Sequence, residues 1–224
     1  MGSKREKYPE KCPWDLGPNQ HLAKEENWTL RLGEANVCFS KNKLDNNYFH
    51  VISNENEIAD CSTVLDLMSS WDSYLPKWKK YKKVIGHGLN KQELEKNKIF
   101  DSYWIQNFNL NQQIPLDKES VDYCLLVAAW QYLQYPENLT KDIARILSRN
   151  GKIIIAFSNR AFWHKAPNIW TSSTEEERVK YVRKVLISNG FHEPKIIKKY
   201  TEPALNIFNF LNKDPFYCLI ATKE

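Results

Sequence analysis

An acid and two serines lie where a short apolar run of the chain ends. Val64–Leu67 is typical of a buried strand, and Met68–Trp71 forms the turn that leaves it. A buried strand that ends on an acid and a small-residue turn is typical of a ligand-binding loop at the carboxyl edge of a parallel sheet. The hydroxyls of Ser69 and Ser70 can donate hydrogen bonds to a carboxylate. Asp66 and this turn are therefore the first candidate binding segment.

Two further predicted strands end on glycines and amides. The stretch Lys82–Asn90 contains a short apolar strand, and Ser102–Asn109 forms the next one. Glycine lets a backbone approach a ligand closely, and an amide oxygen accepts hydrogen bonds. The candidate binding residues in these two segments are Gly86, His87, Gly88, Asn90, Asn107 and Phe108.

Polar and aromatic residues also follow two more apolar strands, Val121–Ala129 and Lys152–Phe157. Arg160 can bind a carboxylate or phosphate, and Trp163 can present its ring face to a cation. His164 is the candidate general base, with a plain surface histidine as the alternative. The candidate residues after these strands are Ala128, Trp130, Gln131, Tyr132, Asn159, Arg160, Trp163 and His164.

Helices between the strands must position these residues. Asn90 is suited to cap the first helix, Asn150 with Gly151 to end the second, and Gly190 to stop the third. The predicted helices cover Lys91–Asn97, Glu137–Ser148 and a segment from a capping box, Ser173 or Thr174 with Glu176 or Glu177, to Ser188. The last two strands cover Phe191–Lys198 and Phe216–Thr222. Strands that alternate with helices predict an α/β fold, a doubly wound and mostly parallel seven-stranded sheet.

The amino-terminal part of the chain has no long periodic segment. Residues 1–45 form an extension that either packs its aromatic side chains on the domain or covers the ligand crevice as a lid. Tyr48–Ile58 is expected to form a helix, and Trp71–Tyr81 a short helix or turn broken at Pro76. We therefore expect one α/β domain over residues 46–224.

The composition limits the classes of partner. The net charge of +5 is modest, so no nucleic acid is expected, although the lysines and aromatics of Lys77–Lys83 could form either a nucleic-acid patch or a solvated loop. Five scattered cysteines without a CxxC spacing predict neither disulfides nor a metal site and fit a reducing compartment. No stretch approaches the roughly 18 apolar residues of a membrane span. We therefore expect a soluble, cytoplasmic protein.

The order of these strands and motifs resembles the class I S-adenosylmethionine-dependent methyltransferases over about residues 48–223. More closely, it is similar to a branch of the methyltransferase type 11 proteins. That branch has the motifs found here at Val64–Trp71, Gly86–Asn90 and Phe157–Arg160. The resemblance implies a Rossmann-like fold whose last strand is antiparallel, and S-adenosyl-L-methionine as cofactor.

The resemblance also implies a role for each candidate residue. Asp66 would meet the cofactor's ammonium, directly or through water, or only cap the loop. Met68, Ser69, Ser70 and Trp71 would face the cofactor's methionine part. Gly88 stands where the family has an acid for the ribose, so Asn90 or His87 would serve instead, or Asn90 only caps the helix. Asn107 would accept a hydrogen bond from adenine, and Phe108 would pack on its ring. Ala128–Tyr132 would line the space between the sulfonium and the methyl acceptor, with Ser158–Arg160 and Trp163–Trp170 on the far side, where acceptors bind.

These roles predict methyl transfer to a small-molecule acceptor by direct in-line displacement. The Asn-Pro-Pro-Tyr signature of nucleic-acid amino methylation does not follow the fourth strand, where Ala128–Gln131 stands. The alternative is a non-catalytic binding or regulatory protein with the same fold, because the turn without glycine, Gly88 and Asn107 all depart from the family pattern. The acceptor and the oligomeric state stay open.

Overall fold

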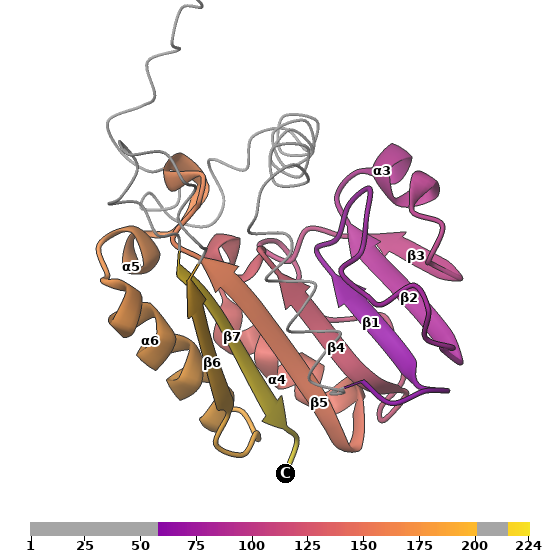
Figure 1. Ribbon diagram of the computed structural model, residues 1–224. Helices are drawn as coiled ribbons and strands as arrows, with labels where there is room; N and C mark the ends of the chain where they lie inside the picture. Colours follow the sequence, from indigo (N-terminus) through magenta and orange to yellow (C-terminus); the bar gives the residue numbers. More distant parts are fainter. Residues whose placement is uncertain (1–57, 201–214) are drawn as a thin grey trace, which may run out of the picture.

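The computed structural model describes residues 58–200 and 215–224, and these form one seven-stranded sheet (Figure 1). The strand order is β3-β2-β1-β4-β5-β7-β6. Neighbouring strands from β3 to β5 are parallel, and β7 runs antiparallel to both β5 and β6. The predicted α/β fold, a mostly parallel sheet with an antiparallel last strand, is confirmed.

The strands are β1 Thr63–Leu67, β2 Lys83–Gly88, β3 Ser102–Ile105, β4 Val121–Val127, β5 Leu147–Ser158, β6 Lys195–Tyr200 and β7 Pro215–Thr222. The α-helices are α3 Lys91–Lys96, α4 Pro136–Ile146, α5 Asn168–Thr171 and α6 Glu175–Ile187. Two short 3-10 helices follow strands, η2 Trp130–Tyr132 after β4 and η3 Trp163–Lys165 after β5.

Alternate residues of the central strands enter two separate hydrophobic clusters, because successive side chains of a strand point to opposite faces. Leu65 and Ile155 belong to the cluster beneath α4 and α6, whereas Val64 and Ile154 belong to the cluster on the other face. The α4 helix lies against one face of β4 and β5 (Figure 1). Both faces of the central strands are therefore buried, as expected for a parallel sheet.

The sequence signals predicted at three helix ends agree with the structure. The Asn90 side chain accepts hydrogen bonds from Gln92 N and Glu93 N, and Thr174 with Glu177 forms the predicted capping box of α6. Gly190 has a φ of 85° directly after α6, which is a conformation that favours glycine. These three predictions are confirmed.

Several predicted boundaries were wrong. The third strand ends at Ile105 instead of Asn109, because residues 107–111 form a turn in which Leu110 N donates to Asn107 O. The helix after Pro136 ends at Ile146, and Leu147 already pairs with Val121. The Asn150–Gly151 cap was therefore misplaced: Asn150 has a φ of 62°, but it lies within β5.

One other strand boundary also differs from the prediction. The sixth strand begins at Lys195 instead of Phe191: Pro194 directly precedes the strand, and Phe191 forms only an isolated bridge. Between β1 and β2, the turn of the two predicted alternatives is found: Lys79 N donates to Pro76 O, and the segment has no helix. The predicted lid in residues 1–45, and nearly all of the helix expected over Tyr48–Ile58, lie outside the described residues.

Within residues 58–200 and 215–224, no helix is long and apolar enough to cross a membrane. Over the same residues, no group of three or more His, Cys, Asp or Glu side chains is placed to hold a metal ion.

Candidate functional site

A hollow opens at the carboxyl ends of β1, β2 and β4. Such a position is where ligands bind in open α/β sheets, since the loops that follow the strands diverge there. Its walls are formed by Met68, Ser69, Ser70, His87, Gly88, Leu89, Asn90, Glu93, Gln106, Asn107, Phe108, Asn109, Val127, Ala128, Ala129, Tyr132 and Leu133.

The turn after β1 approaches β2 closely without a glycine. Met68 has a φ of 55°, in the left-handed region that favours glycine. Its N–H donates to His87 Nδ1 at 3.1 Å, and Ser69 N donates to His87 O at 2.7 Å. On the other side of the turn, Asn97 Nδ2 donates to Ser70 O at 2.9 Å. Side chains of β2 and of the residue after α3 therefore hold a conformation that glycine usually provides.

Both ring nitrogens of His87 are bonded to backbone. Nδ1 accepts from Met68 N, and Nε2 lies 2.8 Å from Gln106 O, so Nε2 carries the proton. Complete burial lowers the pKa of His87 to about 3, and the ring is neutral. The ring also packs on Phe108, with ring centroids 4.1 Å apart. The expected contact of a His87 nitrogen with a ribose is thus corrected: the residue braces the wall of the hollow.

Gly88 and Gly86 have different roles. A Cβ at Gly88 would lie 2.6 Å from Ser69 O, so no larger residue, and no acid, fits there without moving the turn. A Cβ at Gly86 would collide with the Phe100 ring, and Gly86 does not line the hollow. Of these two glycines, only Gly88 lines the hollow, and its missing side chain makes room for the turn after β1.

Glu93 brings a carboxylate into the hollow that the sequence analysis missed. It extends from α3, is 4% exposed, and accepts hydrogen bonds from Ser70 Oγ and, at 3.0 Å, from Asn90 Nδ2. Burial raises its pKa, and the hydrogen bonds from Ser70 and Asn90 oppose that shift. Its spacing from Asn90 is that of a capping box, which is the one local signal that could have identified it.

Asp66 lies beneath the turn and does not line the hollow. Ser69 Oγ donates to Asp66 Oδ2 at 2.9 Å. Burial raises the pKa of Asp66 to about 6, although hydrogen bonds from Ser73 and Ser69 act in the opposite direction. Asp66 is thus linked to the wall of the hollow through Ser69. Trp71 does not line the hollow either, and its ring contacts the Lys96 ammonium at 4.6 Å.

The loop after β3 forms the opposite wall. Asn107 Oδ1 accepts from Asn109 N at 2.9 Å and keeps a second lone pair for a ligand. Asn109 Nδ2 donates to Tyr132 O at 3.0 Å, which ties this loop to η2. Phe108, 3% exposed, packs on His87. Asn107 and Phe108 are thus both in the hollow, as predicted.

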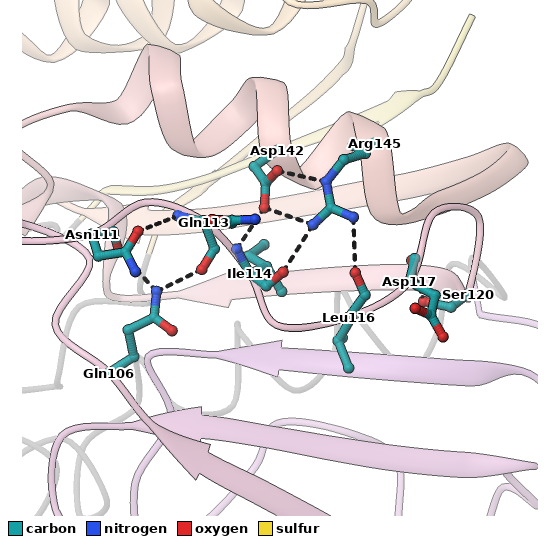
Figure 2. A network of polar contacts seen from close by, with 9 residues as sticks. All are labelled: Gln106, Asn111, Gln113, Ile114, Leu116, Asp117, Ser120, Asp142 and Arg145. Carbon is teal, nitrogen blue, oxygen red and sulfur yellow. Dashed lines mark hydrogen bonds and ion pairs between the residues drawn. The ribbon is translucent and has the colours of Figure 1, made fainter.

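A polar network holds this loop against α4 (Figure 2). Arg145 makes a two-point contact with Asp142 and also donates to Ile114 O and Leu116 O, each at 2.8 Å. Asp142 accepts from Ile114 N at 2.6 Å. Gln106 Nε2 donates to the carbonyls of Asn111 and Gln113, both at 2.8 Å. The wall that carries Asn107 is therefore fixed from both ends.

Among the residues predicted to bind substrate, Tyr132 lines the hollow. Ala128, the predicted neighbour of the sulfonium, also lines it and has a φ of 54°. The residues that do not line it are Trp130, Gln131, Asn159, Arg160, Trp163 and the candidate base His164. The lining residues that the sequence analysis missed are Leu89, Glu93, Gln106, Asn109, Val127, Ala129 and Leu133.

The sequence matches the family described as "Methyltransferase domain" over residues 71–155, which is less than half of the chain. A comparison with curated proteins found no match. The segment that does match contains β2, β3, β4 and α4 and therefore most of the walls of the hollow.

Solved structures share the fold over most of their length. One is a chain from a Haloferax volcanii complex between the Trm112 methyltransferase activator and a protein described as a methyltransferase. Its TM-score is 0.62 at 15% identity, and the match covers 89% of this chain and 97% of that one. A Thermotoga maritima protein described as an S-adenosylmethionine-dependent methyltransferase has a TM-score of 0.60 and 14% identity, covering 90% and 100%.

A Listeria monocytogenes protein, described as an S-adenosylmethionine-dependent methyltransferase, has a TM-score of 0.58 and 16% identity, covering 80% of this chain and 98% of its own. At such identities these likenesses show the fold: the chain has the Rossmann-like fold of S-adenosylmethionine-dependent methyltransferases.

Proposed function

We propose that this chain is an S-adenosylmethionine-dependent methyltransferase that transfers a methyl group to a small molecule by direct in-line displacement. The observation that carries the proposal is the hollow at the ends of β1, β2 and β4, where the Glu93 carboxylate and the Gly88 backbone lie together. The match to the family described as "Methyltransferase domain" and the fold of the similar structures support it.

The residues of the hollow fit the parts of S-adenosylmethionine. Glu93 uses its carboxylate for Ser70 and Asn90, but a carboxylate has about four acceptor positions, so two remain for the ribose hydroxyls. Glu93 would thus supply, from α3, the acid that the end of β2 lacks. Asn107 Oδ1 would accept from the adenine amino group, and Phe108 would pack on the adenine ring.

The turn after β1 would hold the amino-acid part of the cofactor. The Ser69 hydroxyl donates to Asp66, and the turn presents small side chains instead of a bulky wall. When bound, S-adenosylmethionine supplies an electrophilic methyl group on a positively charged sulfur. The protein's task is then to orient donor and acceptor in line and to exclude water, which can account for a large part of the rate enhancement without a covalent intermediate.

A small-molecule acceptor agrees with the charge of the chain. The net charge is only +5, and a strong concentration of basic residues on one face, as nucleic-acid binding usually needs, is not indicated by the sequence. We include a cytoplasmic location in the proposal because the five scattered cysteines have no CxxC spacing and fit a reducing compartment.

Calorimetry with S-adenosylmethionine and S-adenosylhomocysteine tests the cofactor site. We expect both to bind the intact protein with dissociation constants tighter than about 1 mM. Glu93→Gln should weaken S-adenosylhomocysteine by about tenfold, since hydrogen bonds to a charged group are worth about 1.5–3 kcal/mol. The matched control is Glu95→Gln, an exposed acid on the same helix, which should bind as the wild type does.

The role of Glu93 can be separated from its effect on the turn. Wild-type protein should prefer adenosine to 2′,3′-dideoxyadenosine by about tenfold, and Glu93→Gln should lose most of that preference. If neither S-adenosylmethionine nor S-adenosylhomocysteine binds the wild type, the proposed function is wrong. If both bind but Glu93→Gln keeps the preference for adenosine, the ribose lies elsewhere.

A further inference from the structure

Ser70 links the turn after β1 to both ends of α3. Its Oγ donates to Glu93 Oε2 in the first turn of the helix, and its carbonyl oxygen accepts at 2.9 Å from Nδ2 of Asn97, the residue at the helix C-cap. All three residues are buried, so water competes little for these hydrogen bonds. One buried serine therefore ties the turn to the whole helix.

The α3 helix depends on such contacts because it is short. It has six residues, Lys91–Lys96, and isolated helices of fewer than about 12 residues are marginal in water. Its Leu94 side chain lies against the end of β2, where a Cβ added to Gly88 would be 3.2 Å from Leu94 Cδ2. That apolar contact holds the helix on the sheet, but it does not determine where the Glu93 carboxylate points.

The Glu93 carboxylate is held at both of its oxygens. Asn90 Nδ2 donates to Oε1 at 3.0 Å, and Ser70 Oγ donates to Oε2. Glutamate has three rotatable side-chain bonds, so without these donors the carboxylate could take several positions. All three residues line the hollow, and Asn90 caps the helix that carries Glu93. The bond from Ser70 is therefore the one that relates the carboxylate to the opposite wall.

The hydrogen bonds of Glu93 also act on its charge. Burial raises the pKa of Glu93 above its ordinary value of 4.5, and the Ser70 and Asn90 hydrogen bonds oppose that rise, since they stabilise the ionised form. Both donors are neutral groups. Ser70 therefore influences the charge of Glu93 as well as its direction.

The other titratable groups on the elements around Glu93 have partners or charge states of their own. His87 on β2 is neutral, Asp66 accepts from Ser69 beneath the turn, and burial raises the pKa of Tyr132 on η2 to about 12. The exposed charged groups of the turn and of α3 pair as Asp72 with Lys77 at 3.5 Å and Lys91 with Glu95 at 3.6 Å, and the Lys96 ammonium lies over the Trp71 ring.

We propose that Ser70 is a positioning residue for cofactor binding, which keeps the Glu93 carboxylate charged and directed at the ribose of S-adenosylmethionine. The inference rests on the proposed function, because it concerns the same site and adds a residue that acts through Glu93. Hydrogen bonds to a charged carboxylate are about twice as strong as those between neutral groups. Ribose binding therefore weakens as the pH falls and Glu93 takes up a proton, and Ser70 sets how far the pH must fall.

A double-mutant cycle tests whether Ser70 acts through Glu93. The quantity measured is the preference for adenosine over 2′,3′-dideoxyadenosine, by calorimetry at pH 7.5, which is about tenfold for the wild type. Ser70→Ala should lower it to about threefold or less, because one of the two donors that direct the carboxylate is lost. In the Glu93→Gln background, Ser70→Ala should change the preference by less than about twofold. Equal losses in the two backgrounds would show that Ser70 acts independently of Glu93 and overturn the inference.

Two serine variants serve as controls. Ser70→Thr keeps the hydroxyl and should retain the preference within about twofold of the wild type. Ser73→Ala removes a buried hydroxyl of the same turn that bonds to Asp66 instead of Glu93, and it should keep the full preference. The melting temperature is measured first for every variant, and Ser70→Cys, whose thiol is a weak donor, replaces Ser70→Ala in the cycle if that variant does not fold. A preference that Ser70→Ala keeps, or that Ser73→Ala loses equally, overturns the inference.

The pH profile gives a readout that a merely structural role would not change. The preference of the wild type for adenosine should fall as the pH is lowered from 8 to 5. In Ser70→Ala it should fall at a higher pH, since a group that opposes the raised pKa of Glu93 is gone. Asp66, whose pKa is about 6, also titrates in this interval, but it lies beneath the turn and affects the two nucleosides alike.

The outcomes separate this inference from the proposed function. A wild-type protein that does not bind S-adenosylhomocysteine contradicts the proposed function. Binding of S-adenosylhomocysteine without a preference for adenosine, or with the same pH profile in the wild type and in Ser70→Ala, leaves the proposed function in place and overturns the role of Ser70.

Discussion

At the scale of single residues, the site is shaped by two buried titratable groups with opposite effects. His87 stays neutral because burial lowers its pKa to about 3, and both of its nitrogens hold backbone. Asp66 has its pKa raised to about 6 by burial. The free energy of unfolding depends on pH wherever the folded and unfolded states bind different numbers of protons. These two residues therefore act against each other in mildly acidic solution.

The sign for His87 follows from its two pKa values. Between about pH 3 and pH 6.5 the unfolded state binds a proton that the folded state does not, so the stability that neutral His87 provides is present above pH 6.5 and is lost as the pH falls towards 3. We expect His87→Phe to remove this loss of stability at acidic pH. The difference in free energy of unfolding between wild type and His87→Phe, measured with urea, should be about 3 kcal/mol larger at pH 7 than at pH 4.

Asp66→Asn provides the opposite control. Its folded pKa lies above the ordinary 3.8, so ionisation of buried Asp66 lowers stability as the pH rises from about 4 to 6. The asparagine variant should therefore gain stability relative to wild type over that interval. A pH-independent difference for His87→Phe would contradict the assignment of His87 as a neutral brace.

At the scale of elements, the loop between β3 and β4 is held by α4 more than by its own sequence. Arg145 and Asp142 bind the backbone of Ile114 and Leu116, as Figure 2 shows, and that backbone leads back to the wall of the hollow. The loop contains Asn107 and Phe108, so its order sets the width of the site. A contact on the helix thereby positions residues that would touch a ligand.

Arg145→Lys tests this link, because lysine keeps the charge but cannot donate to Asp142, Ile114 and Leu116 together. We expect a loss of about 1–3 kcal/mol in the free energy of unfolding. Hydrogen exchange followed by mass spectrometry should show faster exchange in residues 106–116. The control is Arg149→Lys, an exposed position just beyond α4, which should leave exchange unchanged. Equal exchange in both variants would show that the loop is held by other contacts.

The elements also show what the sequence could predict. Apolar runs and caps are local, so β1, β2, β4, α3 and the start of α6 were placed well. β3 ends before the turn at residues 107–111, and Asn109 of that turn donates to Tyr132 O, a long-range contact that no local pattern contains. Glu93 was missed for the same reason: its spacing predicts a helix cap, and only the fold brings it to Ser70.

At the scale of the whole molecule, one hollow collects residues from six segments of the chain. The turn after β1, the end of β2, α3, the loop after β3, the end of β4 and η2 all contribute to its walls. Asp66, the residue on which the sequence argument depended most, lies beneath that hollow and not in it. The sequence therefore identified the location of the site better than the atoms that face a ligand.

A ligand that binds only the folded hollow must stabilise the whole domain. At a concentration 100 times its dissociation constant, S-adenosylhomocysteine should add about 2.7 kcal/mol, which raises the melting temperature by about 5–10 °C for a chain of this size. Gly88→Ala should abolish the rise, because its methyl group would displace Ser69. A rise of equal size in Gly88→Ala would place the ligand outside the hollow.

The hollow lies between two residues with left-handed backbone, Met68 with a φ of 55° and Ala128 with a φ of 54°. For residues with a Cβ this conformation costs about 1 kcal/mol or more relative to glycine. Glycine could replace either residue without a change in the path of the backbone. A turn with glycine and the turn found here therefore differ by a single amino-acid substitution. Searches that define a binding loop by its glycines would overlook such chains, whereas searches by backbone conformation would find them.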